Sequence, residues 1–310
     1  MTVTDTGRRD GPIITIGLPA YNNARTIVRA LDSLRNQTER RLQLIVSDDG
    51  STDGTPGIVA EQARIDPRVR LIQQPRNLNY GNYRFVLGQS ETPYFMFAAG
   101  DDWWEPDFVE RCVDCLERNP DAAGAITRVM MHPADEAPYL SLSTEEIRGD
   151  ARTRVATYLR DPKDNSRMYA VFRTSIAQRA FPRLDHHAYD WTFSVGTLLH
   201  GEHREVPVIG MHREVTPWER YTEYVRRDAR NSIERLFPLG PMTRSLLFEY
   251  GIPINMSILR SLVFLNTRHH RLYVRRFHPR VKEFYDAVGR AWRSSRIPRV
   301  WTYVFPGKKP

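Results

Sequence analysis

Residues 42–54 of this 310-residue chain read LQLIVSDDGSTDG, and this stretch decides the fold class. Its first five residues form a short apolar run, which is typical of a strand buried on both faces. The run ends in a polar loop that contains three aspartates and two glycines. Residues 55–65 follow with helical periodicity and residues 69–72 with a second apolar run, so the stretch predicts a strand, a loop, a helix and another strand.

The same alternation extends in both directions from this stretch. Further strands are predicted at residues 13–18, 94–98 and 122–130, and further helices at residues 24–37 and 106–118. In the helix over 24–37, the stripe expected to be buried consists of Ile27, Val28, Leu31 and Leu34. Strands that alternate with helices are typical of a mostly parallel sheet flanked by helices. The predicted fold class is therefore α/β, with a ligand crevice beyond the carboxyl ends of the strands.

Polar clusters follow four of the predicted strands, at residues 19–23, 48–54, 76–81 and 100–104. Because the carboxyl ends of parallel strands meet at one edge of a sheet, these loops can converge on one crevice. Their acidic side chains include Asp48, Asp49, Asp101 and Asp102. Clustered carboxylates need a cation or hydrogen bonds to stay charged, and oxygen ligands of this kind suit Mg²⁺ or Mn²⁺ completed by substrate phosphates. The alternative is helix capping, which we favour for Asp53.

In combination and order, three motifs of the chain resemble those of the family 2 glycosyltransferases. They are residues 18–22 (LPAYN), 46–53 (VSDDGSTD) and 100–103 (GDDW). The resemblance covers Ile14 to Asn119 and continues more loosely to about residue 215. It implies the GT-A fold and the transfer of a sugar from a nucleotide-sugar with inversion at the anomeric carbon.

The resemblance also implies roles for individual residues. In the family, the first loop and the first aspartate of the second loop hold the nucleotide, an aspartate after the fourth strand holds a divalent cation, and a later carboxylate deprotonates the acceptor hydroxyl. The implied nucleotide-sugar contacts are Pro19, Ala20, Tyr21, Asn22, Asp48, Arg84, Asp101 and Trp103. The implied catalytic base is Asp190, and the implied metal ligands are Asp101, Asp102 and His212.

Two of these assignments have a structural alternative. The face of Trp103 can stack on a sugar ring or pack in the core. Family members often carry a histidine or arginine in the region of His212 and Arg213, where a cation would stabilise the leaving group. A lone histidine, however, is more often structural.

Three positions depart from the family pattern. Ala99 occupies the first position of the usual Asp-x-Asp metal motif, so one ligand or ribose contact is missing. Tyr189 replaces the glutamate of the usual Glu-Asp pair, which leaves Asp190 to act as the base, and Phe85 replaces an asparagine. A pseudoenzyme that binds a sugar or a nucleotide is therefore an alternative. A nucleotidyltransferase is another, although residues 19–23 lack the glycine-rich run with Arg and Lys that such an enzyme would normally show.

The net charge of +8 is divided unevenly along the chain. Residues 1–210 contain 25 basic and 29 acidic residues, whereas residues 211–310 contain 20 and 8, and 12 of those 20 lie in residues 261–310. Apolar residues between 281 and 292 recur at helical spacing among basic ones. This pattern predicts either a helix on an anionic membrane surface or a helix packed on the catalytic domain. No nucleic-acid partner is expected, because no nucleic-acid-binding motif accompanies the charge.

The predicted organisation has three parts: a flexible tail over residues 1–11, a GT-A domain over 12–215 and a basic helical region over 216–310. Residues 12–131 are expected to hold the nucleotide-sugar and residues 132–215 the acceptor. A weakly periodic segment from about 132 to 165 predicts a variable insertion of loop and helix.

The chain shows no signal peptide and no uninterrupted run of about 18 apolar residues. The expected location is therefore the cytoplasm, or the cytosolic face of a membrane. Cys112 and Cys115 fall on one face of a predicted helix and are interpreted as structural. The expected donor is a UDP-, GDP- or dTDP-linked sugar. The expected acceptor is a carbohydrate or a lipid-linked carbohydrate, in the synthesis of a cell-surface polysaccharide or glycolipid.

Overall fold

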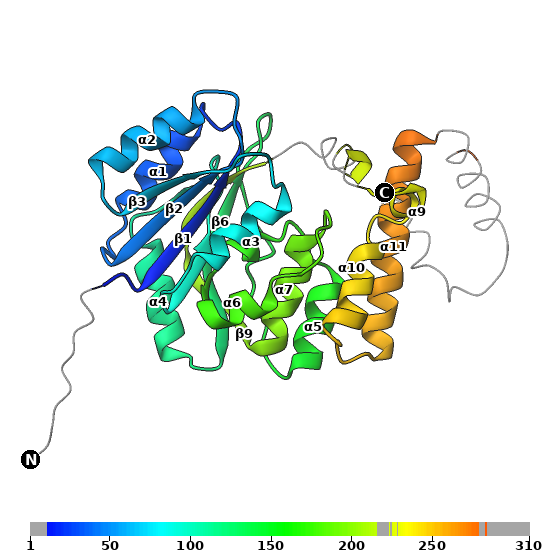
Figure 1. The fold of residues 1–310 in the computed structure, drawn as a ribbon. Coiled ribbons are helices and arrows are strands. Elements are labelled where there is room, and N and C mark those ends of the chain that lie inside the picture. The colour runs from blue at the N-terminus through cyan, green and yellow to red at the C-terminus, as the bar shows by residue number, and fades with distance from the viewer. Residues whose placement is uncertain (1–10, 216–222, 224, 228, 279–282, 284–310) are drawn as a thin grey trace, which may run out of the picture.

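A nine-stranded mixed sheet with helices on both faces forms the body of the molecule (Figure 1). The computed structural model describes residues 11–215, 223, 225–227, 229–278 and 283. Apart from Gly11, the flexible tail predicted over residues 1–11 lies outside the described residues. The helical pattern predicted between 281 and 292 also lies outside them, except for Glu283.

The strands follow the order β3-β2-β1-β4-β8-β6-β9-β5, and β7 pairs with β6 outside this path. Their bounds are β1 Ile14–Ala20, β2 Leu42–Asp48, β3 Val69–Gln73, β4 Tyr94–Phe97, β5 Trp103–Trp104, β6 Ala122–His132, β7 Tyr139–Leu140, β8 Val171–Arg173 and β9 Glu202–Glu214. The pairs β1–β2, β1–β4, β2–β3 and β6–β9 are parallel and contain most of the paired residues. Strands β5, β7 and β8 pair antiparallel. The predicted class, an α/β fold with a mostly parallel sheet, is confirmed.

Strand β1 lies inside the parallel part of the sheet and is buried almost throughout, as its apolar sequence predicts. Gly17 is required in it, because a Cβ at this position would lie 2.8 Å from Phe95 Cζ and 2.9 Å from Val86 Cγ2. The register with β2 places Ala20 opposite Asp48. The first two predicted loops therefore start side by side at one edge of the sheet.

The helices divide between the two faces of the sheet (Figure 1). One face carries α1 (Ile27–Arg35), α2 (Thr55–Ile65) and α4 (Phe108–Arg118), and the other carries α3 (Tyr80–Gly88), α6 (Thr174–Ala180) and α7 (Tyr189–His200). Because α3 connects β3 to β4 on the opposite face from α1 and α2, the strand order reverses between β1 and β4. Such a reversal opens a crevice at the carboxyl ends of the strands, which is where ligands bind in folds of this kind.

The first helix differs from its prediction. It begins at Ile27 and not at residue 24, because the carbonyl of Asn23 accepts hydrogen bonds from the amides of Thr26 and Ile27 (2.9 Å each) and closes a turn. Its buried stripe consists of Ile27, Ala30, Leu31 and Leu34. Val28, predicted to belong to the stripe, is 42% exposed, because with about 3.6 residues per turn the spacing 27, 30, 31, 34 already fills the inner face.

A second layer of helices packs against α7 on the side away from the sheet. It consists of α5 (Ala151–Arg160), α9 (Ser232–Leu236), α10 (Gly240–Arg244), the π-helical turn η2 (Ser245–Glu249) and α11 (Met256–Phe277). Apolar side chains of α5, α7, α10 and α11 form a second core, separate from that of the sheet. The segment predicted to vary contains β7 and α5, and the described part of the C-terminal region is mostly helical, as predicted.

Candidate active site

Hydrogen bonds join the loops after β1 and β2 at the carboxyl edge of the sheet. The amide of Asn22 donates to Ser51 Oγ (2.9 Å), and Asn22 Oδ1 accepts from the amide of Thr52 (2.9 Å). Asn22 adopts a φ of 53°, a conformation that asparagine tolerates better than most residues. The predicted pair of loops is therefore one preformed wall of the crevice.

Asp48 ends β2 at the base of this wall and is 2% exposed. Its Oδ2 accepts a hydrogen bond from the amide of Ser51 (3.1 Å), while its Oδ1 has no hydrogen-bond partner within the described part of the chain. A buried carboxylate oxygen without a partner carries a desolvation cost, and a donor group of a ligand would remove that cost. Beside it, Tyr21 is 49% exposed and offers an open aromatic face.

The neighbouring aspartates hold the loops in place. The carboxylate of Asp49 accepts hydrogen bonds from the amides of Leu78 (2.7 Å) and Asn79 (3.0 Å), and burial raises its pKa against their effect. The carboxylate of Asp53 accepts from the amide of Thr55 (2.9 Å), the first residue of α2, from one position before the cap of that helix. Both carboxylates are therefore engaged within the protein.

After β4 the two consecutive aspartates differ in environment. Asp102 is 2% exposed, its Oδ1 accepts from the amide of Glu214 (3.2 Å), and its Oδ2 lies 3.4 Å from Nε of Arg213. Burial raises the pKa of Asp102 to about 7, and the charge of Arg213 opposes this shift. Asp101 is partly exposed; burial raises its pKa as well, and Arg213 again opposes the shift. Of the two carboxylates, that of Asp101 is the one open to a ligand.

His212 has a protein partner at each ring nitrogen. Its Nδ1 lies 3.0 Å from Nε2 of His132, and its Nε2 lies 3.0 Å from Oε1 of Glu105. Its ring stacks on Trp103 with centroids 5.0 Å apart and planes 3° apart, and the guanidinium of Arg29 lies 3.9 Å from the centroid of Trp103. Trp103 is thus packed among cationic and imidazole groups, which agrees with its structural alternative.

The predicted metal ligands do not come together as a ready-made cage. Within the described ranges, no three His, Cys, Asp or Glu side chains are grouped to hold a metal ion. Contrary to the expectation, Asp102 is bound to Arg213 and both ring nitrogens of His212 have partners. Asp101 remains, and a single carboxylate completed by substrate phosphates is an ordinary binding mode for Mg²⁺. The donor set therefore fits a cation that arrives with a diphosphate.

Arg213 is the cation at the centre of this site, and the choice of His212 from the sequence missed it. Its Nη1 donates to Ser166 Oγ (3.0 Å), and its guanidinium lies 4.6 Å from the centroid of Tyr169. Its charge lowers the pKa of both Asp101 and Asp190. The only sequence signal was its position next to His212 at the end of an apolar strand.

Asp190 lies in the first turn of α7, and Asn165 Nδ2 donates to its Oδ2 (3.0 Å). The Oδ1 of Asn165 in turn accepts from the hydroxyls of Tyr158 (2.9 Å) and Ser194 (3.0 Å). Burial raises the pKa of Asp190, and the hydrogen bond from Asn165 and the charge of Arg213 oppose the shift. A carboxylate whose pKa is raised by burial is suited to accept a proton near neutral pH.

Asn165 was not predicted from the sequence. It is 2% exposed and adopts a φ of 51° in the turn before η1 (Ser166–Tyr169). The turn fixes both polar groups of the site, because Asn165 contacts Asp190 and the next residue, Ser166, contacts Arg213. A lone asparagine outside a recognised motif gave no signal for this role.

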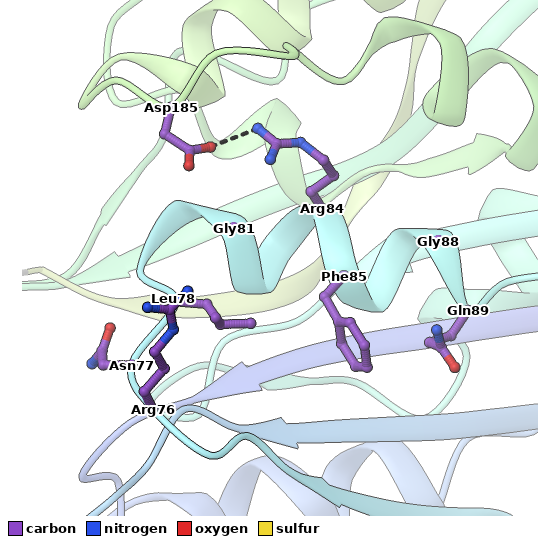
Figure 2. A pocket seen from close by; sticks show the side chains of 9 residues that line it. All are labelled: Arg76, Asn77, Leu78, Gly81, Arg84, Phe85, Gly88, Gln89 and Asp185. Carbon is purple, nitrogen blue, oxygen red and sulfur yellow. Dashed lines mark hydrogen bonds and ion pairs between the residues drawn. The ribbon is translucent and has the colours of Figure 1, made fainter.

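Arg84 joins α3 to the connection between α6 and α7. Its guanidinium pairs with Asp185 (2.5 Å) and donates to the carbonyls of Pro182 (3.1 Å) and Arg183 (3.0 Å). Figure 2 shows this pair at the rim of a cavity of about 590 Å³. The cavity is lined by Arg76, Asn77, Leu78, Gly81, Arg84, Phe85, Gly88, Gln89 and Asp185. None of the predicted carboxylates lines it, and in this structure Arg84 secures the chain that leads to Asp190.

The two cysteines lie together on α4, as the pattern predicts. Cys112 is buried and Cys115 is partly buried, and both are free thiols. Burial raises the pKa of each thiol. Unreactive thiols on the inner side of a helix agree with a structural role.

Comparison with known proteins gives a family match over the same residues. A family model described as "Glycosyl transferase family 2" matches residues 15–181, which is more than half of the chain. The match includes the loops of Asp48 and Asp101 and ends before Asp190.

Two curated relatives illustrate the likeness in sequence. The chain is 38% identical over 112 residues to a chondroitin synthase of Escherichia coli, covering 33% of this chain and 15% of that protein. It is 39% identical over 115 residues to the succinoglycan biosynthesis protein ExoO of Rhizobium meliloti, covering 37% of this chain and 31% of that protein. The chain therefore matches less than a third of the length of either relative.

Solved structures match over most of the chain. The Staphylococcus aureus protein TarS (residues 1–349), in complex with UDP-GlcNAc, superimposes with a TM-score of 0.56 at 14% identity, covering 84% of this chain and 80% of that one. A mannosyltransferase from Pyrobaculum calidifontis, in complex with GDP-Man and Mn²⁺, gives 0.55 at 18% identity, covering 95% and 84%. At these identities the likeness concerns the fold, and it confirms the predicted GT-A arrangement.

Proposed function

The chain belongs to glycosyl transferase family 2, and we propose that it transfers a sugar from a nucleotide diphosphate-sugar to a hydroxyl acceptor with inversion at the anomeric carbon. The observation that carries the proposal is the shared influence of Arg213 on Asp101 and Asp190. Asp101 belongs to the half expected to bind the donor, residues 12–131, and Asp190 to the half expected to bind the acceptor, residues 132–215. One cation thus serves a site with a carboxylate for each reactant.

Asp190 acts as the general base in this proposal. Its Oδ2 is oriented by Asn165, which leaves Oδ1 to accept the proton of the acceptor hydroxyl. Burial raises the pKa of the carboxyl, so the proton is held more readily than by an exposed aspartate. The acceptor oxygen then attacks the anomeric carbon as the bond from that carbon to the diphosphate breaks, which inverts the centre.

Arg213 stabilises the charge that develops on the departing diphosphate. It is already held by Asp102, Ser166 and Tyr169, so it needs little reorganisation during the reaction. Asp101 is the residue that would hold a Mg²⁺ or Mn²⁺ ion together with the diphosphate. When bound, such an ion supplies Lewis-acid neutralisation of the leaving group.

The nucleotide would bind at the wall formed by the first two loops. The free Oδ1 of Asp48 accepts an N–H or O–H group, and the exposed ring of Tyr21 offers a stacking face. Pro19 and Ala20 supply backbone at the end of β1, and Asn22 fixes the loop. These contacts recognise a nucleoside and leave the choice among UDP-, GDP- and dTDP-sugars to the groups around the base.

The acceptor class follows from the relatives and is part of the proposal. One of them is a chondroitin synthase and another is a protein of succinoglycan biosynthesis. We therefore propose a carbohydrate or lipid-linked carbohydrate as the acceptor, in the assembly of a cell-surface polysaccharide or glycolipid.

A donor screen tests the proposed function. The protein is incubated with UDP-, GDP- and dTDP-sugars plus Mn²⁺ or Mg²⁺, with and without oligosaccharide acceptors, and released nucleoside diphosphate is measured. We expect one nucleotide class to give release that depends on the added cation and on the acceptor. If every donor stays intact while one nucleotide binds in calorimetry, the chain is a binding protein, which its Ala99 and its lack of a grouped metal site would favour.

The pH dependence of this activity should change when Asn165 is replaced. Asn165→Ala removes a donor to the charged form of Asp190 but leaves the burial that raises its pKa, so the pKa of Asp190 should rise further. Because the base must be deprotonated, the acid limb of the kcat profile should move to higher pH. The measurement is nucleotide release against pH.

Two further variants separate this effect from backbone strain. Asn165→Gly accommodates the positive φ and should move the acid limb as Asn165→Ala does. Tyr158→Phe removes one hydrogen bond to Asn165 Oδ1 but keeps the donor to Asp190, so its profile should stay near that of the wild type. A profile of Asn165→Gly that superimposes on the wild type would remove Asn165 from the mechanism.

A further inference from the structure

Helix α11 has one buried and one exposed apolar face. The inner face carries Ile258, Leu262 and Leu265, which are buried in the second core. The outer face carries Met256, Leu259 and Val263, which are 61%, 45% and 57% exposed. Positions 256, 259 and 263 are neighbours on a helix surface, so these side chains form a continuous stripe. Ile254, just before the helix, is 57% exposed and extends it.

The same face continues onto α9. His270, two turns beyond Val263 on the stripe, stacks on Phe237 with ring centroids 5.1 Å apart. Phe237 is nevertheless 48% exposed, and Ile233 of α9 is 72% exposed. We define the outer face as Ile254, Met256, Leu259 and Val263 together with Ile233 and Phe237. Isolated exposed apolar residues are common, but a grouped set of six indicates a contact surface.

The charge of α11 indicates what this surface meets. Residues 256–277 contain five arginines and no Asp or Glu. Arg260 lies between the stripe residues and is exposed, and Arg268 is exposed further along the helix. Two copies of the chain that packed through this helix would bring like charges together, which disfavours a second copy as the partner. An anionic partner is favoured instead.

We propose that the outer face rests on the surface of an anionic lipid bilayer. Apolar side chains flanked by arginines, without acidic residues, are the composition of helices that lie in the membrane interface. No helix among residues 11–215, 229–278 and the described positions between and after them could cross a membrane. The helix lies along one side of the molecule, beyond α5 and α10 as seen from the sheet (Figure 1).

This orientation would couple the membrane to the acceptor half of the site. His269 of α11 meets the ring of Trp191 edge-on, with centroids 5.4 Å apart. Trp191 directly follows the proposed base, Asp190. A bilayer at the outer face would therefore lie on the side of the molecule from which a lipid-linked acceptor reaches the base. The membrane contact itself does not depend on the transferase activity.

Vesicle sedimentation with the full chain tests the proposal. The probes are vesicles of phosphatidylcholine alone and of phosphatidylcholine with phosphatidylglycerol. We expect binding to the anionic vesicles that weakens as salt is raised, and little binding to the neutral ones. The double variant Met256→Ser/Val263→Ser should bind the anionic vesicles about tenfold more weakly, because it removes two apolar groups from the interface.

A matched variant and two further measurements keep the test decisive. Ile65→Ser changes a residue that is 60% exposed on α2, on the other side of the sheet, and should bind as the wild type does. Equal vesicle binding by the double variant and the wild type would overturn the proposal. So would a loss of thermal stability in the double variant, which would mean that the chain itself covers the face, or a dimer in size-exclusion chromatography that the double variant disrupts.

Discussion

Replacing Asp190 by Asn should lower kcat by about 10²–10⁴-fold, the range typical for loss of a general base. The amide keeps the shape of the carboxylate and can still meet Asn165 after a flip, but it cannot take the proton of the acceptor. Binding of the nucleotide should be unchanged, because the nucleotide wall is built from the loops after β1 and β2. The measurement combines steady-state transfer with calorimetric titration of the nucleotide found in the donor screen.

Asp114→Asn is the matched control for this variant. Asp114 forms an exposed ion pair with Arg118 on α4 (3.2 Å), so the same chemical change there should leave both kcat and nucleotide affinity unaltered. Turnover that survives in Asp190→Asn would show that another group takes the proton. Loss of nucleotide affinity in the same variant would show that Asp190 contributes to donor binding and would contradict its placement on the acceptor side.

Arg213→Met should impair both catalysis and folding. The loss of a preorganised charge beside the leaving group should cost about 10²–10³-fold in kcat. The loss of the partner of Asp102, which is 2% exposed, should lower the free energy of unfolding by about 3–5 kcal/mol, because an uncompensated carboxylate would remain buried. The measurements are transfer kinetics at a temperature where the variant is folded, and urea unfolding.

Arg213→Lys separates the two effects. The lysine retains a positive charge for Asp102, so much of the stability should return, but it cannot reproduce the planar contacts with Ser166 and Tyr169. Its kcat should therefore stay well below that of the wild type. Arg128→Met, which breaks a more exposed pair with Glu205, should change stability by no more than about 1 kcal/mol and leave kcat intact. Wild-type kcat in Arg213→Met would exclude the proposed role in leaving-group stabilisation.

The sequence alone was sufficient for the frame of the molecule. Apolar runs and helical stripes report local burial, so the strands at the centre of the sheet and the helices between them could be placed to within a few residues. The strand-end loops could be predicted to meet because parallel strands end at the same edge, and the loops that contain Asn22 and Asp48 are hydrogen-bonded to each other. Val28 shows the limit of the method, since several stripes were compatible with the same apolar residues.

What the tertiary structure alone decided was the division of labour among polar neighbours. Nothing in the order Asp101-Asp102 indicates that the second carboxylate is buried against Arg213 while the first stays open. The choice between His212 and Arg213 depends on which side of β9 each faces, and register shifts in the pairing of β6 with β9 prevent counting that alternation from the sequence.

The part played by Asn165 came only from the fold, because its partners Tyr158, Asp190 and Ser194 lie on α5 and α7 and are brought to it by packing. The sequence thus determined the sheet, its crevice and the residue types gathered there, since these follow from local periodicity and strand direction. The protonation, partners and accessibility of each group depend on contacts between segments far apart in the chain, and only the packed structure defines those contacts.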